Sequence, residues 1–235
     1  GCITAYFLLK KDRRGWESHM FDLGLVIAFA GIVGGRLWDV FFFDWEYYHN
    51  HLLEIPYIWQ GGMAIQGGII FACIAAYFYL KKHQIPVLPF ADTVTPGIIL
   101  GQAIGRIANF MNGDAFGHPT GQDFGLLYPD TTLAYHTYGA QPLWPAEVWE
   151  CQGDLLIFVL LLWYGCKTRA EGTTFCLYIM FYSLLRFFLE NYRGDYGTLA
   201  LGLKSAQLTS LAAFAGAFIF LYFHFKHKSK SGISE

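Results

Sequence analysis

The chain has 235 residues, of which 54% are hydrophobic, 19% aromatic and only 14% charged. Soluble domains carry about 25% charged residues, so this chain has too few charges to cover a water-exposed surface. Its formal net charge is −2, and it has no basic tract interleaved with aromatic residues, which excludes a nucleic-acid partner. The composition therefore predicts an integral membrane protein.

Apolar runs of near membrane-spanning length follow one another along the chain, where about 20 helical residues cross a hydrocarbon core. The apolar run before Lys10 is shorter, so we expect it to be the inner part of a first helix that is truncated here. The other predicted spans lie at roughly 21–43, 62–80, 90–110, 151–166, 172–190 and 205–225. This pattern predicts an all-α, polytopic protein of about seven transmembrane helices, with residues 1–235 forming a single transmembrane domain.

Basic residues cluster at every second junction between these runs. Lysine and arginine gather on the cytoplasmic side of membrane proteins, so the clusters predict an N-terminus outside and a C-terminus inside. One junction on the outer side, residues 113–150, is long and rich in glycine, proline and aromatic residues, and we expect an external loop with a functional role. The basic clusters comprise Lys10, Lys11, Arg13, Arg14, Lys81, Lys82, Lys167, Arg169, Lys226, Lys228 and Lys230.

Arginines also lie inside the predicted helices, where a cation costs ~2.5 to 3.5 kcal/mol and faces a partner in the bundle interior. By the predicted topology, Arg36, Arg106 and Arg186 all lie toward external helix ends and share one depth. Guanidinium groups match phosphate oxygens, so these arginines predict a site for a phospholipid headgroup. The alternative is internal ion pairing of these arginines with Asp39, Asp114 or Glu190, and it has the most weight for Arg36. Glu190 lies four residues after Arg186, where it can orient that guanidinium.

The cysteines and histidines do not indicate a metal centre. The five cysteines show no CxxC spacing and lie mostly in apolar runs, so they predict neither a disulfide framework nor a zinc site. The eight histidines lack the spacing of metal ligands. We therefore expect no metal and no cofactor.

The sequence around Arg106 is polar for a helix end near lipid. Asn109 shares a helix face with Arg106, and the helix is expected to end in a polar turn at Asn112–Asp114. This segment, GRIANFMNGDAFG, resembles the signature GRxGNFxNxExxG of the bacterial prolipoprotein diacylglyceryl transferase family. Other segments resemble the family in the same order: GGRLWDVFF near 34–42, WQGGMAIQGG at 59–68, ADTVTPGIILGQAIGR at 91–106, LLRFFLENYR at 184–193 and SAQLTSL at 205–211.

The resemblance covers essentially the whole chain and implies a transferase of the bacterial cytoplasmic (inner) membrane. The implied reaction moves the diacylglyceryl group of phosphatidylglycerol to the lipobox cysteine thiol of a prolipoprotein and releases glycerol phosphate. This is the first step of bacterial lipoprotein maturation. The family's seven-helix, N-out fold agrees with the charge pattern. The expected partners are phosphatidylglycerol, the lipobox of the prolipoprotein signal peptide and the lipid bilayer.

The resemblance also assigns residues, with departures from the family pattern. Asp114 stands where the family usually has glutamate, and Gln66 stands where it usually has histidine. The later His-Pro pattern corresponds to Gln141-Pro142 without its tyrosine, which leaves Glu147 as the recognisable residue. The predicted catalytic residues are Arg106, Arg186, Asp114 and Glu190, and the predicted substrate-binding residues are Arg106, Asn109, Asn112, Gly117, Gln66, Arg36 and Glu147.

The identity of the general base is open at this stage. A cysteine thiol with a pKa of about 8.5 must lose its proton to attack, and Gln66 cannot accept one. Asp114 is the preferred base, with Glu190, His118 and His136 as alternatives. Gln66 also leaves open a phospholipid-binding paralogue without catalysis. Seven helices with buried arginines leave open a membrane transporter of an organic anion.

Overall fold

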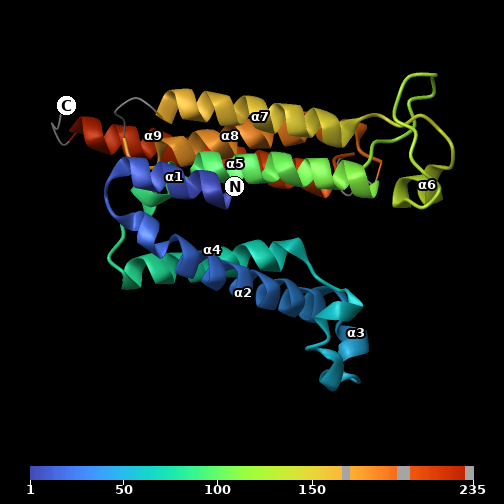
Figure 1. Cartoon of the computed structure of the whole chain (residues 1–235), viewed down its shortest axis with the longest axis horizontal. Coiled ribbons are helices and arrows are strands. Elements are labelled where there is room, and N and C mark those ends of the chain that lie inside the picture. The colour runs from blue at the N-terminus through green and yellow to red at the C-terminus, as the bar shows by residue number, and fades with distance from the viewer. Residues whose placement is uncertain (166–169, 195–201, 231–235) are drawn as a thin grey trace. The chain divides into compact units, whose positions relative to one another are not determined.

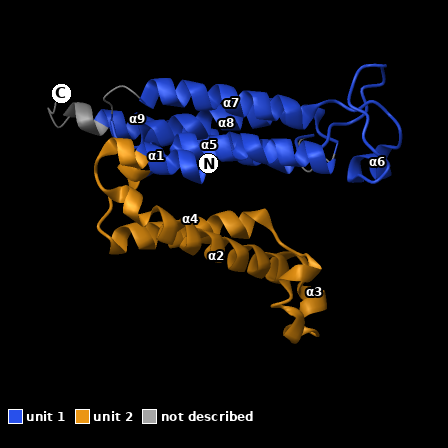
Figure 2. Ribbon diagram, in the orientation of Figure 1, with its two compact units in different colours: residues 1–8, 91–235 blue, residues 9–90 orange. Residues whose placement is uncertain are grey.

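The computed structural model describes residues 1–165, 170–194 and 202–230, without the side chains of 227–230. Within these ranges the chain is helical, with isolated β-bridges and no strand, which confirms the predicted all-α class. It divides into two compact units, each described by itself below (Figure 2): unit 1 comprises residues 1–8 and 91–235, and unit 2 comprises residues 9–90. The single domain stays a prediction. Cys166, Lys167 and Arg169, and the side chains of Lys228 and Lys230, lie outside the described residues.

Unit 2 is built on two antiparallel helices, α2 (Met20–Trp38) and α4 (Ile65–Lys82), as Figure 1 shows. They cross where Gly34 faces Gly67. A Cβ atom on Gly67 would lie 2.2 Å from the backbone oxygen of Gly34. The two backbones approach so closely because neither glycine has a side chain. The connection between the helices contains a π-helical turn (Asp39–Phe43), α3 (Trp45–Tyr48) and two 3-10 turns (Leu52–Glu54 and Ile58–Gln60).

Unit 1 contains the long helices α7 (Ala146–Gly165), α8 (Thr173–Leu189) and α9 (Ser205–Lys230). It also contains most of α5 (Val87–Asn112) and the start of α1 (Cys2–Asp12). Helix α8 packs against both α7 and α9. Ile99 of α5 joins Ile157 and Leu161 of α7 in the buried core. The side chain of Asp92 on α5 accepts hydrogen bonds from the backbone N–H groups of Gly172 and Phe175, and so caps the start of α8.

The predicted apolar runs all form helices, and these are α2, α4, α5, α7, α8 and α9. Among the described residues, four helical segments are long and apolar enough to cross a membrane. Helices α1, α4 and α7 are not among them, so seven spans stay a prediction. The four segments are Trp16–Phe43, Val87–Asn112, Thr173–Tyr192 and Ser205–Lys226.

The predicted external loop, residues 113–150, is wrong at its C-terminal boundary. Helix α7 begins at Ala146, directly after Pro145, so residues 146–150 belong to the helix. The acidic residues Glu147 and Glu150 make this stretch look like loop sequence, but the fold buries both side chains completely. The rest of the segment contains α6 (Leu133–Tyr138), whose first turn is capped by the Thr132 hydroxyl.

Candidate functional site

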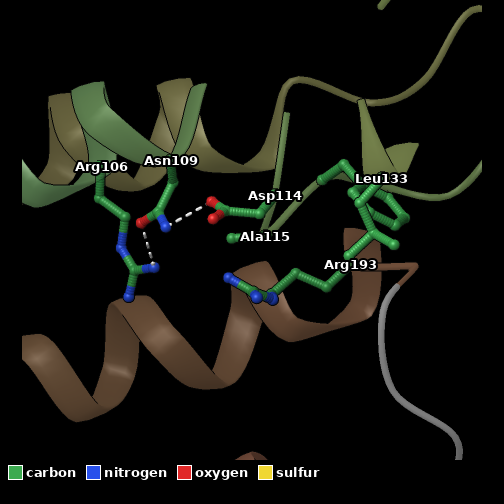
Figure 3. A pocket seen from close by; sticks show the side chains of 7 residues that line it. Arg106, Asn109, Asp114, Ala115, Leu133 and Arg193 are labelled. Carbon is green, nitrogen blue, oxygen red and sulfur yellow. Dashed lines mark hydrogen bonds between the residues drawn. The ribbon is translucent and has the colours of Figure 1, made fainter. Parts of the chain in front are cut away.

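Helix α5 ends in a polar turn that carries the signature residues. Arg106 and Asn109 lie one turn apart, and the Arg106 guanidinium donates to the Asn109 side-chain oxygen at 3.3 Å. The Asn109 amide nitrogen donates to the Asp114 carboxylate at 2.5 Å (Figure 3). Gly113 holds a φ of +67° between them, a conformation that favours glycine. The hydrogen bonds of Asn109 and Asp114 at the end of α5 thus orient the Arg106 side chain.

Glu150 of α7 is the acceptor on which three arginines converge. Its side chain is 1% exposed, and its carboxylate oxygens lie 2.8 Å from the Arg106 guanidinium, 3.0 Å from that of Arg186 and 3.5 Å from that of Arg193. The Tyr182 hydroxyl donates to the same carboxylate at 3.2 Å. A buried carboxylate is stable only with such partners, so the ion pairs hold α5, α7 and the end of α8 together.

Glu190 supplies a second carboxylate to this cluster. It lies 2.9 Å from the Arg186 guanidinium, four positions earlier on the chain, as the sequence spacing predicts. It is also 4.0 Å from Arg193 and is fully buried. Arg186 therefore lies between two carboxylates, those of Glu150 and Glu190, and both of its terminal nitrogens are engaged in ion pairs.

Arg193 reaches the cluster because the turn after α8 is held on two sides. On one side, Gly117 and Arg193 form an antiparallel bridge. Gly117 also lies close to Trp144, because a Cβ atom on Gly117 would be 2.2 Å from the Trp144 backbone oxygen. On the other side, the Lys204 ammonium donates to the backbone oxygens of Glu190 and Arg193 at 2.9 and 2.6 Å. Gly117, a predicted binding residue, is therefore a position where only glycine fits the packing.

A cavity of about 480 Å³ opens beside these residues. Arg106, Asn109 and Asp114 form its polar wall together with Arg193, and their side chains point toward one another in Figure 3. Its remaining lining residues are Ala115, Phe116 and Leu133. Two guanidinium groups beside an apolar wall suit an organic phosphate, because the guanidinium fork matches phosphate oxygens.

Two predicted binding residues belong to unit 2. The Arg36 side chain is 4% exposed, and its guanidinium donates to the backbone oxygens of Glu54, Ile55, Tyr57, Gly61 and Gly62. It also lies 4.0 Å from the Asp39 carboxylate, as the ion-pair alternative expects. Gln66 is exposed in the first turn of α4. Both residues therefore belong to a different unit from the cluster of Arg106 and Glu150.

The remaining predicted site residues lie at the end of α5, at the start of α7 and in the segment between these helices. Asn112 is exposed at the end of α5. Glu147 accepts a hydrogen bond from the Tyr128 hydroxyl. His118 bonds through Nδ1 to the Pro119 backbone oxygen, and His136 is exposed on α6. Among the residues with described side chains, no group of three histidines, cysteines or acids could hold a metal ion.

Sequence reasoning missed Glu150 and Asp154 and did not assign Arg193. The available signal was the spacing of Glu147, Glu150 and Asp154, because positions i, i+3 and i+7 share one helix face. Acids on one face of an apolar run predict a buried charged partner, which the arginines of α5 and α8 provide.

Comparison with known proteins supports the family seen in the sequence motifs. A model of the prolipoprotein diacylglyceryl transferase family matches residues 1–223. The chain is 38% identical over 216 residues to a phosphatidylglycerol–prolipoprotein diacylglyceryl transferase of Geobacillus kaustophilus, covering 90% of this chain and 80% of the relative. Proteins of the same name from Clostridium botulinum strain Langeland and Nitrosomonas europaea are 37% and 33% identical, covering 94% and 97% of this chain and 86% and 82% of the relatives. The predicted resemblance is confirmed: this chain belongs to the prolipoprotein diacylglyceryl transferase family and is a transferase.

Proposed function

We propose that this chain transfers the diacylglyceryl group of phosphatidylglycerol to the lipobox cysteine of prolipoproteins, and that the reaction takes place in the cavity beside Arg106. The observation that carries the assignment of the site is the pairing of two guanidinium groups, from Arg106 and Arg193, with an apolar wall in one cavity. The names of the relatives supply the two substrates.

In the proposed complex, the lipid phosphate lies between Arg106 and Arg193. This revises the sequence prediction, which grouped Arg106 with Arg36 and Arg186 as the site for the headgroup. Arg186 does not line the cavity and is held by two carboxylates. Its role is then to fix Glu150, which in turn fixes the Arg106 guanidinium before the substrate arrives. Such preorganisation avoids reorganising charges during the reaction.

The chemistry is a displacement at the glycerol carbon of the diacylglyceryl group. The cysteine sulfur forms a bond to that carbon while the carbon–oxygen bond to the phosphate breaks, and the electron pair leaves with the phosphate oxygen. The leaving glycerol phosphate gains a second negative charge, which Arg106 and Arg193 stabilise. Among the predicted bases Asp114 lines the cavity, so we assign it the thiol proton; Glu190 is ion-paired with Arg186.

We further propose the predicted membrane placement: seven spans in the bacterial cytoplasmic membrane, with the N-terminus outside and the C-terminus inside. The basic residues Lys10, Lys11, Lys81 and Lys82 support this orientation, because they follow the positive-inside rule. In this orientation the cavity beside Arg106 lies near the outer surface, where an exported prolipoprotein presents its lipobox.

The test is to incubate the purified protein in phosphatidylglycerol nanodiscs with a lipobox peptide and to follow the peptide mass. We expect a diacylglyceryl mass gain that is lost in Arg106→Ala. Gln66→His is run alongside: a gain in this variant but not in the natural protein identifies a paralogue that lost its chemistry at that position. No gain in either protein contradicts the proposed reaction and favours lipid binding or anion transport.

A further inference from the structure

Helix α7 carries a third acid that the site described above does not use. Glu147, Glu150 and Asp154 share one helix face, and all three residues are buried. Glu147 is bonded to Tyr128, and Glu150 to the arginine cluster. Asp154 lies one turn further into the helix than Glu150.

Within the described part of the chain, neither carboxylate oxygen of Asp154 has a hydrogen-bond partner. The hydroxyl of Tyr178, which is within electrostatic reach of Asp154, donates to the Gln102 side chain at 2.9 Å. The charged or titratable groups within electrostatic reach of Asp154 are Glu150 and Cys151 on α7, Arg106 on α5, and Arg186 and Tyr178 on α8.

The charge of Asp154 affects how strongly Arg106 can bind an anion. A buried carboxylate without hydrogen-bond donors is costly in its ionised form, and Glu150 repels it further. Arg106 and Arg186 attract it. A phosphate in the cavity would also be attracted to Arg106. The phosphate and the ionised Asp154 carboxylate therefore compete for the positive charge of Arg106. Two such events are thermodynamically linked: each weakens the other by the same factor.

We propose that Asp154 is a positioning residue that couples phosphate binding to proton uptake. It is protonated while a phosphate occupies the cavity beside Arg106, and its ionised form weakens phosphate binding. The proton comes from solvent and returns to solvent when glycerol phosphate leaves. The inference rests on the proposed function in one respect, that the anion is the phosphate of phosphatidylglycerol.

The first test measures KM for phosphatidylglycerol and kcat in nanodiscs between about pH 5 and 9. In the natural protein we expect KM to rise with pH, by up to about tenfold per unit where Asp154 ionises. Asp154→Asn is expected to show a KM fixed near the low-pH value, with kcat changed little, and Asp154→Glu to restore the slope. Asp123→Asn, which changes an exposed loop carboxyl, is the control and keeps the slope.

A second test needs no turnover. Calorimetric titration of the natural protein with glycerol phosphate, in two buffers of different ionisation enthalpy, is expected to show uptake of a proton, and none in Asp154→Asn. Binding without proton uptake in the natural protein overturns the inference even if no variant folds, as does an unchanged pH slope in Asp154→Asn. Proton-coupled binding without any peptide modification contradicts the proposed reaction instead.

Discussion

Arg36 and Arg106 lie in different units and show two ways of burying an arginine in an apolar helix. In unit 2, Arg36 donates to backbone oxygens of residues 54–62, and its guanidinium stacks 4.9 Å from the Tyr48 ring. In unit 1, Arg106 pairs with the carboxylate of Glu150 and the side chain of Asn109 and still lines a cavity. The sequence predicted the same phosphate-binding role for both residues.

The hydrogen-bond acceptors around each arginine decide whether its guanidinium is available to a ligand. Backbone carbonyls accept hydrogen bonds from all three nitrogens of the Arg36 guanidinium, which shapes the connection between α2 and α4. Glu150 is shared among Arg106, Arg186 and Arg193, and Glu190 supplies a second carboxylate to the last two of these guanidinium groups. Arg106 and Arg193 still line the cavity, so their guanidinium groups can donate to an anion there.

The largest expected effect comes from Arg106→Lys. Lysine keeps the charge but cannot reproduce the planar fork toward Glu150, Asn109 and a phosphate. We expect turnover to fall by about 10³-fold, in the range seen for loss of one preorganised donor at a developing charge. The peptide-mass assay measures this. Activity within a few-fold of the natural protein would show that Arg106, like Arg36, has a structural role.

Glu150→Gln removes the shared carboxylate while preserving shape and an acceptor for Tyr182. We expect about a 100-fold loss of turnover, because the three guanidinium groups then repel one another and lose their common anchor. The matched control is Glu171→Gln at an exposed position, which is expected to stay active. Equal activity of the two variants contradicts the assigned role of Glu150.

Arg36→Lys tests the structural role of the arginine in unit 2. An ammonium has three donors and cannot satisfy the carbonyls that Arg36 holds, so we expect a stability loss of about 1–2 kcal/mol. Hydrogen exchange is expected to speed up in residues 44–64, with turnover changed less than in Arg106→Lys. Lost turnover with unchanged exchange would instead support the predicted binding role of Arg36.

Lys204→Met removes the ammonium that holds the Glu190–Arg193 turn but keeps the length of the side chain. We expect about a fivefold rise in KM for phosphatidylglycerol, because the turn loses both hydrogen bonds from the ammonium and the placement of Arg193 loosens. The effect is expected to vanish in an Arg193→Ala background. Additive losses in the double variant would mean that Lys204 acts on another part of the site.

The smallest effect is expected for Tyr47→Phe in the connection that Arg36 organises. The Tyr47 hydroxyl donates to the Glu54 carboxylate at 2.7 Å, which raises the pKa of Tyr47 above its usual value. A group with a raised pKa contributes its stability below the unfolded pKa, about 10, and loses it as pH rises further. Because the pair is exposed, we expect a shift of under about 1 °C at neutral pH, measured by thermal unfolding, and none above about pH 11.

Local sequence patterns were enough for the helices and for part of the site. Runs of apolar residues predicted α2, α4, α5, α7, α8 and α9, because burying a helix in lipid or core requires such runs. The neighbours Arg106, Asn109 and Asp114 were predicted together because they lie within two turns of one helix end. The pair of Arg186 and Glu190 followed from the i,i+4 spacing.

The long-range partners could not be predicted from the sequence. Glu150 lies 44 positions after Arg106 and 36 before Arg186, and nothing in the local pattern of α7 says which cation its face meets. The start of α7 was predicted as loop because its acids were counted as polar, whereas tertiary packing pairs them with arginines of other helices. The bridge at Gly117 and the bonds from Lys204, which help to place Arg193 at the cavity, also join segments far apart in the chain.

The amino-acid sequence was enough to predict the class of protein, the helices, the family and the polar residues at the end of α5. Only the tertiary structure decided which arginines share a carboxylate and which one is used by backbone carbonyls. The physical reason is that composition and periodicity report local burial, while the partner of a buried charge depends on contacts between segments far apart in the chain.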